Sequence, residues 1–133
     1  MSTRSAIGIV NSDNTITAIY CHWAGNPAHN GKILVNHYSD ETKVRELISI
    51  GDLSSLGEVV GEKTDFDTPK KGQCIYYGRD RGDAGVDCKQ FPSLSSVKSF
   101  YDASDYFYIF EDGEWTCRND VNKMIPLGKF KKA

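Results

Sequence analysis

Long hydrophobic runs are missing from this sequence of 133 residues. A membrane-spanning helix needs roughly 18 consecutive apolar residues, and no stretch approaches that length. The chain starts MSTRSAIGIV, in which Arg4 directly precedes a short alternating run instead of a long apolar one. We therefore expect no membrane contact and no secretory signal, and we expect the protein to act in the cytoplasm.

An excess of charge of one sign is also lacking. Lys and Arg number 16, Asp and Glu number 18, and the formal net charge is -2. Without a strong positive field, the molecule as a whole is not suited to direct non-specific nucleic-acid binding, so a local basic patch must bind any anionic partner. The only notable charge block is GKFKKA at 128–133, which is more typical of a solubilising end than of a binding arm.

Cysteine pairs with the spacing of metal or redox motifs are absent. The four cysteines are Cys21, Cys74, Cys88 and Cys117, and no two of them form a C-x-x-C pair. They fit reduced cytosolic thiols. A zinc site made of Cys21, His22 and a distant cysteine is geometrically feasible, but no ligand spacing supports it. We expect no metal and no other cofactor.

Motifs of common catalytic machinery are missing as well. There is no G-x-S-x-G nucleophile elbow, and GNPAHNGK lacks the G-x-x-x-x-G-K-[ST] spacing of a phosphate-binding loop. Cys21 and His22 are adjacent, so on a strand their side chains point to opposite faces and cannot form a thiolate pair with each other. A small enzyme is therefore the least favoured class of function.

The residues that are present alternate between strand and helix patterns. Runs rich in β-branched and aromatic residues flank NSDN at 11–14 and Asp112–Gly113, which predicts two hairpins. The run 106–110 is apolar on both faces, so we expect this strand inside the sheet with helices on at least one side. Apolar residues at helical spacing predict short helices at about 30–38, 40–50 and 93–102.

The middle of the chain has weaker patterns. The segment 51–73 is rich in Gly, Ser, Asp and Lys, so it should be mostly loop, with at most a brief strand at 58–60. From Cys74, the run CIYYGRDRG is typical of a strand that continues to Arg81. We therefore expect a single α+β domain over residues 1–133, with two to three short helices packed on an antiparallel sheet of hairpins.

Four blocks of the sequence, in this order, carry a family resemblance: TRSAIGI, IYCHWAGNPAHNGKIL, GDLSSLG and YYGRDRGD. They span most of the chain from Thr3 to about Asp83, and they resemble a family of small, mostly uncharacterised proteins of phages, prophages and some bacteria. The pattern of that family reads C-H-W-D-G-Y-P, whereas this chain has Ala24 in place of the acid and Asn26 in place of the tyrosine. If the acid is catalytic in relatives, this protein lacks the reaction.

The resemblance implies an accessory role in phage infection, in the host-cell cytoplasm. Many small phage proteins of this kind blunt host immunity by binding one of its components. The resemblance names no substrate and no partner.

Arg79 and Arg81 form a closely spaced basic pair. If the preceding strand continues this far, the two side chains lie on one face and can clamp a phosphate or carboxylate through paired N–H donors. Alternatively, both arginines pair with Asp80, Asp83 or Asp87 around a surface turn.

The join YCHWAGNPAHNGK at 20–32 supplies further candidates. We expect Trp23 to fill the corner between strand and helix, and His22 and Lys32 to face outward. If Arg4, His22 and the two arginines converge here, they form a positive, aromatic-walled pocket suited to a nucleotide-like anion. The predicted ligand- or partner-binding residues are Arg4, His22, Trp23, Lys32, Arg79 and Arg81.

Three functions remain open. The first is a non-enzymatic binder that sequesters an anionic, nucleotide-like signal of host immunity. The second is a protein–protein inhibitor of a host defence effector such as a CRISPR nuclease, and the third is a small enzyme. Association into a homo-oligomer also stays open. The inhibitor would occupy a basic nucleic-acid channel with exposed acids: Asp40, Glu41, Asp52, Glu58, Glu62, Asp65 and Asp67.

Overall fold

The central sheet of the protein is built around the first hairpin. The computed structural model describes residues 3–132. Its sheet has eight strands in the order β4-β3-β2-β1-β6-β7-β8, with β5 also paired to β2. The strands are β1 (Ser5–Val10), β2 (Ile16–Cys21), β3 (Leu53–Ser55), β4 (Ile75–Tyr76), β5 (Lys89–Phe91), β6 (Tyr106–Glu111), β7 (Glu114–Asn119) and β8 (Met124–Ile125).

Both predicted hairpins form, and they lie side by side. β1 pairs with β2 and β6 pairs with β7 in antiparallel fashion, as expected. The two hairpins are joined by a parallel pairing of β1 with β6, and β2 meets β3 in parallel at Cys21 and Leu53. The α+β class is confirmed, and the sheet is mixed instead of purely antiparallel, because long connections carry the chain back in the same direction.

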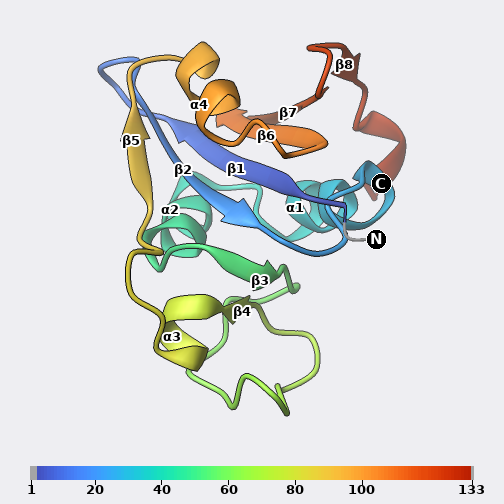
Figure 1. The fold of residues 1–133 in the computed structure, drawn as a ribbon. Coiled ribbons are helices and arrows are strands. Elements are labelled where there is room, and N and C mark those ends of the chain that lie inside the picture. Colours follow the sequence, from blue (N-terminus) through green and yellow to red (C-terminus); the bar gives the residue numbers. More distant parts are fainter. Residues whose placement is uncertain (1–2, 133) are drawn as a thin grey trace.

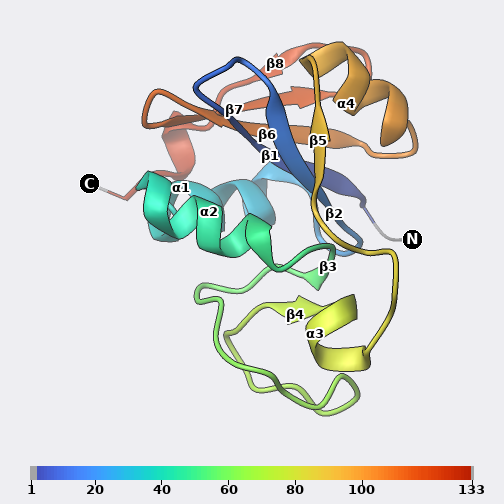
Figure 2. The same ribbon diagram turned by 90° about the vertical axis from the view of Figure 1, so that its left-hand side faces the viewer.

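Helices cover both faces of the sheet. Figures 1 and 2 show α1 and α2 on one face and α4 on the other. The helices are η1 (Pro27–Gly31, a π-helical turn), α1 (Lys32–His37), α2 (Glu41–Ser49), α3 (Tyr77–Arg81), α4 (Leu94–Phe100) and η2 (Gly128–Phe130, a 3-10 turn).

Side-chain caps explain where two of these helices begin. The Asp40 carboxylate accepts the backbone N–H of Lys43 at 2.9 Å, and the Ser93 hydroxyl accepts that of Ser96 at 3.3 Å. Each bond satisfies a backbone donor that the first helical turn leaves unpaired. The three predicted helices are therefore confirmed, within a few residues at their ends.

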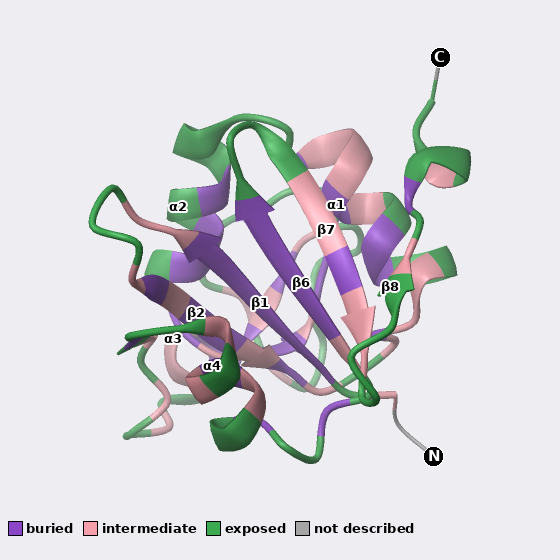
Figure 3. Cartoon of the chain, turned by 90° about the horizontal axis from the view of Figure 1, so that it is seen from above, coloured by how far each residue is buried: buried purple, intermediate pink, exposed green. Residues whose placement is uncertain are grey.

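β6 connects the two apolar cores. Its Tyr108 and Phe110 belong to the larger cluster beneath α1 and α2, whereas Phe107 and Ile109 belong to the cluster beneath α4. All four side chains are buried, and the strand lies between β1 and β7 (Figure 3). The expected place of this strand inside the sheet is confirmed.

The segment 74–81 differs from the prediction. Only Ile75–Tyr76 forms a strand, and the chain then turns into α3, which ends at Gly82 with a φ of 82°. The helical turn brings the Asp80 carboxylate back to the N–H of Tyr76, 2.8 Å away, so a local side-chain bond replaces further strand pairing. The brief strand expected at 58–60 is reduced to one bridge between Val59 and Gln73.

The Asp112–Gly113 turn gives a stability test. Both residues have positive φ, 52° and 80°, as a type I′ turn requires. We expect Gly113→Val to lower the free energy of unfolding by roughly 1 kcal/mol or more in urea denaturation, because β-branched residues resist this conformation. A Cβ at Gly113 meets no atom within 4 Å, so the loss is conformational and not a clash. Gly113→Asn is the control and should lose much less; equal losses would contradict this explanation.

Candidate functional site

The structure distributes the predicted binding residues over three segments. Arg4, His22 and Trp23 flank β1 and β2, Lys32 opens α1, and Arg79 and Arg81 belong to α3. Only Lys32 of these six lines the cleft described below. The pocket of Arg4, His22, Arg79 and Arg81 that was considered from the sequence is therefore not this cleft.

Arg79 is a structural residue with a side chain only 14% exposed. Its guanidinium donates to both carboxylate oxygens of Asp80, at 2.9 and 3.2 Å. It also donates to the carbonyls of Val60 and Gly61, both at 3.1 Å, and to that of Cys74 at 2.9 Å. These bonds tie the two ends of the long β3–β4 connection together.

Arg81 points outward from the same helix. Its guanidinium donates to the two carboxylate oxygens of Asp83 at 2.9 and 2.7 Å, and it lies 4.6 and 4.8 Å from the ring centres of Phe66 and Tyr77. Because residues two apart diverge on a helix, the proposed one-face clamp of Arg79 and Arg81 is wrong. The alternative, in which each arginine pairs with a neighbouring aspartate, is confirmed.

Asp80 is the buried partner of this network. It accepts the backbone N–H groups of Tyr76 and Thr64 at 2.8 and 3.0 Å, besides the bonds from Arg79. Burial by itself would raise the pKa of Asp80, but the hydrogen bonds from Arg79 and from the two N–H groups outweigh it, so the pKa of this carboxyl is lowered.

Trp23 does not fill the corner after β2, so that prediction is wrong. Its side chain is 49% exposed and meets the His22 ring edge-on at 4.7 Å. His22 Nδ1 lies 2.8 Å from the Tyr20 hydroxyl, and His22 is half-buried. At this corner, Gly25 packs against the backbone of residues 3–4, and its carbonyl accepts a hydrogen bond from the Tyr108 hydroxyl at 2.6 Å.

Arg4 lies close to this aromatic group. Burial raises the pKa of the Tyr20 hydroxyl, and the positive charge of Arg4 opposes the rise. The Arg4 guanidinium is exposed and has no carboxylate partner within residues 3–132. Arg4 and His22 therefore flank the same tyrosine, and Tyr77, the first residue of α3, also lies near enough to influence the pKa of Tyr20.

A cleft of about 690 Å³ lies between the η1–α1 segment and the β3–β4 connection. One wall is a helical stripe that includes Ala28, Lys32 and Asn36. The other wall comes from the segments 55–58 and 69–75, and Lys132 completes the lining. Figure 2 shows the elements that supply these walls. We call this feature the cationic cleft.

Its charges are strongly unbalanced. Glu58 is the one acid in the lining, and it pairs with His37 at 3.2 Å between Nε2 and Oε2. None of the four lining lysines has an ion-pair partner in the described part of the chain. The basic residues of the lining are His29, Lys32, His37, Lys70, Lys71 and Lys132.

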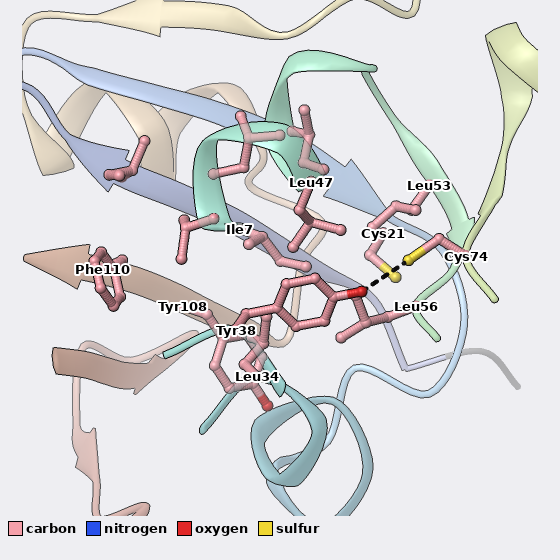
Figure 4. Packing of buried hydrophobic residues seen from close by; sticks show 14 of the residues in the cluster. Ile7, Cys21, Leu34, Tyr38, Leu47, Leu53, Leu56, Cys74, Tyr108 and Phe110 are labelled. Carbon is pink, nitrogen blue, oxygen red and sulfur yellow. Dashed lines mark hydrogen bonds between the residues drawn. The ribbon is translucent and has the colours of Figure 1, made fainter. Parts of the chain in front are cut away.

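A rigid floor supports the cleft. The Tyr38 hydroxyl donates to the carbonyl of Gly57 at 2.7 Å and lies 3.4 Å from Cys74 Sγ (Figure 4). A Cβ on Gly57 would lie 2.4 Å from the carbonyl carbon of Gln73, so the two arms of the connection touch there. Leu56 supplies buried apolar surface beside them. The cleft therefore combines positive charge with a preformed apolar base.

The 128–132 segment is docked on the protein through its backbone and Phe130, while its lysines stay exposed. Asn36 Nδ2 donates to the carbonyl of Phe130 at 2.9 Å, and Asn36 Oδ1 accepts the N–H of Lys132 at 2.8 Å. The Phe130 ring packs against the larger core. These contacts bring Lys132 to the cationic cleft.

Cys21 is part of the core beside this site. Its thiol is buried, donates to the carbonyl of Trp23 at 3.6 Å and accepts a hydrogen bond from Asn30 at 3.4 Å. Burial raises the pKa of Cys21 to about 12, so the thiol is protonated at neutral pH. Within residues 3–132, no three His, Cys, Asp or Glu side chains gather as a metal site would need.

Comparisons add no relative. Neither protein-family models, curated protein sequences nor solved structures give a match to this chain. Over the described residues, no helix has the length and apolar character required to cross a membrane.

Sequence reasoning missed most of the cleft. Its one local signal is the helical stripe formed by residues 28–29, 32–33 and 36–37, which places His29, Lys32 and His37 on one face. Lys70, Lys71 and Lys132 come from a loop and a distant segment, so no spacing in the sequence connects them to that stripe.

The buried Asp80 predicts acid sensitivity. Because its pKa is lowered on folding, the stabilisation is complete above the unfolded value of about 4 and is lost as the pH falls through the folded value. We expect Asp80→Asn to lower the free energy of unfolding by about 3 kcal/mol at neutral pH, since it leaves Arg79 buried without its charge partner. Urea denaturation at several pH values should also show a flatter acid dependence.

Asp83→Asn is the matched control. It removes the same charge from the exposed ion pair of Arg81, and exposed pairs contribute little to stability. Equal destabilisation by the two substitutions would show that burial of the Arg79–Asp80 pair is not what matters.

Proposed function

We propose that this protein is a non-enzymatic binder that sequesters a small anionic ligand of the nucleotide type in the cationic cleft. The observation that carries the proposal is the lining itself, in which four lysines without ion-pair partners in residues 3–132 surround a single acid. Lysine is a compact charge on a flexible stem that binds phosphate well.

The size and base of the cleft support a ligand of this class. Ligand pockets commonly measure about 300–1,000 Å³ and combine apolar walls with a few polar groups, and the cleft of about 690 Å³ falls inside that range. Ile33 and Ile75 are partly exposed and offer apolar surface for a base or sugar, while the lysines offer charge for phosphates.

The biological setting is also a proposal. The resemblance to phage and prophage proteins supports an accessory role that counteracts host immunity in the host cytoplasm. In that setting, the ligand would be an anionic signal molecule, and binding alone would remove it without any reaction.

An acidic hollow supports the alternative, a protein–protein inhibitor of a host defence effector such as a CRISPR nuclease. This hollow of about 510 Å³ lies between the tips of the two hairpins and the start of α2. Its acids Asp40, Glu41, Glu111 and Asp112 exceed its one arginine, Arg45, which is paired with Glu41 at 2.8 Å. A basic partner surface would complement it.

ATP binding, measured by titration calorimetry, tests the cleft. We expect the wild type to bind ATP and Lys70→Gln/Lys71→Gln to bind at least about tenfold more weakly, because a hydrogen bond to a charged group contributes about 1.5–3 kcal/mol. Lys43→Gln/Lys63→Gln removes the same charge from exposed residues outside the lining and should bind normally. If the wild type does not bind ATP, the result contradicts the proposal and favours the alternative, a protein–protein inhibitor.

Ala24 offers a second, sharper test. It lines the cleft and has a φ of 55°, a left-handed conformation that Asp and Asn tolerate better than Ala. Both Ala24→Asp and Ala24→Asn should keep or raise the melting temperature. Only Ala24→Asp adds a negative charge, so we expect it alone to weaken ATP binding severalfold, and equal binding by the two variants would place the ligand elsewhere.

A further inference from the structure

Asn36 occupies a special place in the lining of the cationic cleft. Its amide Nδ2 donates to the carbonyls of Lys32 and Phe130, at 2.8 and 2.9 Å, and its Oδ1 accepts the N–H of Lys132 at 2.8 Å. One half-buried side chain therefore binds both its own helix and the 128–132 segment. Three of the four hydrogen bonds that an Asn amide can form are used in this way.

The chain from Leu127 to Phe130 has separate anchors. Leu127 is buried in the larger core at 7% exposure, and Phe130 packs against the same cluster. These apolar contacts hold the chain up to Phe130. Beyond Phe130, the backbone bond from Lys132 to Asn36 is the contact that directs the chain along α1 and brings the Lys132 side chain to the cleft.

We propose that Asn36 is a positioning residue that holds Lys132 over the cationic cleft, and that the ligand carries two or more linked anionic groups, as in a nucleoside di- or triphosphate. This inference rests on the proposed function. The lining lysines come from three separate segments, with Lys32 on α1, Lys70 and Lys71 on the β3–β4 connection, and Lys132 on the docked segment. A single phosphate is too small to meet all three segments, whereas a chain of phosphates can.

Two consequences distinguish this arrangement from a general attraction of anions. The wild type should bind ATP at least about tenfold more tightly than AMP, since only ATP reaches the additional lysines. Loss of the Lys132 contact should then reduce ATP binding severalfold and change AMP binding little.

The experiment is a double-mutant cycle on the folded protein, with ATP and AMP as probes in titration calorimetry. Asn36→Ala removes the side-chain bonds to Phe130 and Lys132 at a helical position where Ala is favourable. Lys132→Gln removes the charge and keeps the backbone bond to Asn36. If Asn36 acts through Lys132, the double variant binds ATP no more weakly than Asn36→Ala alone. Amide hydrogen exchange at Lys132 should speed up in Asn36→Ala and stay slow in Lys132→Gln.

Lys131→Gln is the matched control, because it removes one charge from the adjacent residue, which is not part of the cleft lining. It should bind ATP as the wild type does. Additive losses in the cycle would show that Asn36 acts independently of Lys132 and would overturn its positioning role. Equal affinity of the wild type for ATP and AMP would overturn the ligand class.

Failure of this inference and failure of the proposed function give different results. Wild-type protein that binds neither ATP nor AMP contradicts the proposed function itself. Wild-type protein that binds ATP, with unchanged affinity in Asn36→Ala and Lys132→Gln, contradicts only the role of the 128–132 segment.

Discussion

The buried pairing of Arg79 with Asp80 is the contact on which the shape of the cleft depends. Apart from one bridge between Val59 and Gln73, residues 56–74 form no strand or helix, so few backbone bonds hold this connection in place. The Arg79 guanidinium donates to the carbonyls of Val60 and Cys74, which lie in the first and last parts of the connection. The Asp80 carboxylate accepts the backbone N–H groups of Thr64 and Tyr76. Together with the contacts of Gly57 and Gln73, this ion pair takes the place of the ladder that a sheet would provide, and it helps to fix the wall that carries Lys70 and Lys71.

Local patterns predicted the hairpins and the helices because turn residues, caps and apolar spacing act within a few residues of one another. The parallel contact between β1 and β6 was not predictable in this way, since it joins segments about a hundred residues apart. β3 was missed because three residues are too few to show an alternating pattern. The strand expected through Arg81 failed because the Asp80 side chain competes for backbone bonds and turns the chain into a helix.

The site prediction was limited for the same reason, because spacing in the sequence indicates local contacts and not distant ones. Lys32 was identified because it lies in a distinctive segment, but its partners in the cleft come from parts of the chain that only the folded structure brings together. Arg79 and Arg81 were attractive because of their spacing, yet each has an aspartate within two residues. An arginine whose guanidinium already binds a neighbouring carboxylate has fewer free N–H donors for a ligand.

Arginine and lysine have different roles in this protein, which explains how a chain with a net charge of -2 can present a positive site. Arg45, Arg79 and Arg81 each bind a carboxylate, since a planar guanidinium can satisfy two acceptors at once. The acids taken up by these arginines are unavailable to the four cleft lysines, whose charges stay uncompensated within residues 3–132. Because these lysines are exposed, their field is screened within about 8 Å at physiological salt. The positive potential is therefore short-ranged and centred on the cleft, which is what the proposed binding of a small anion requires.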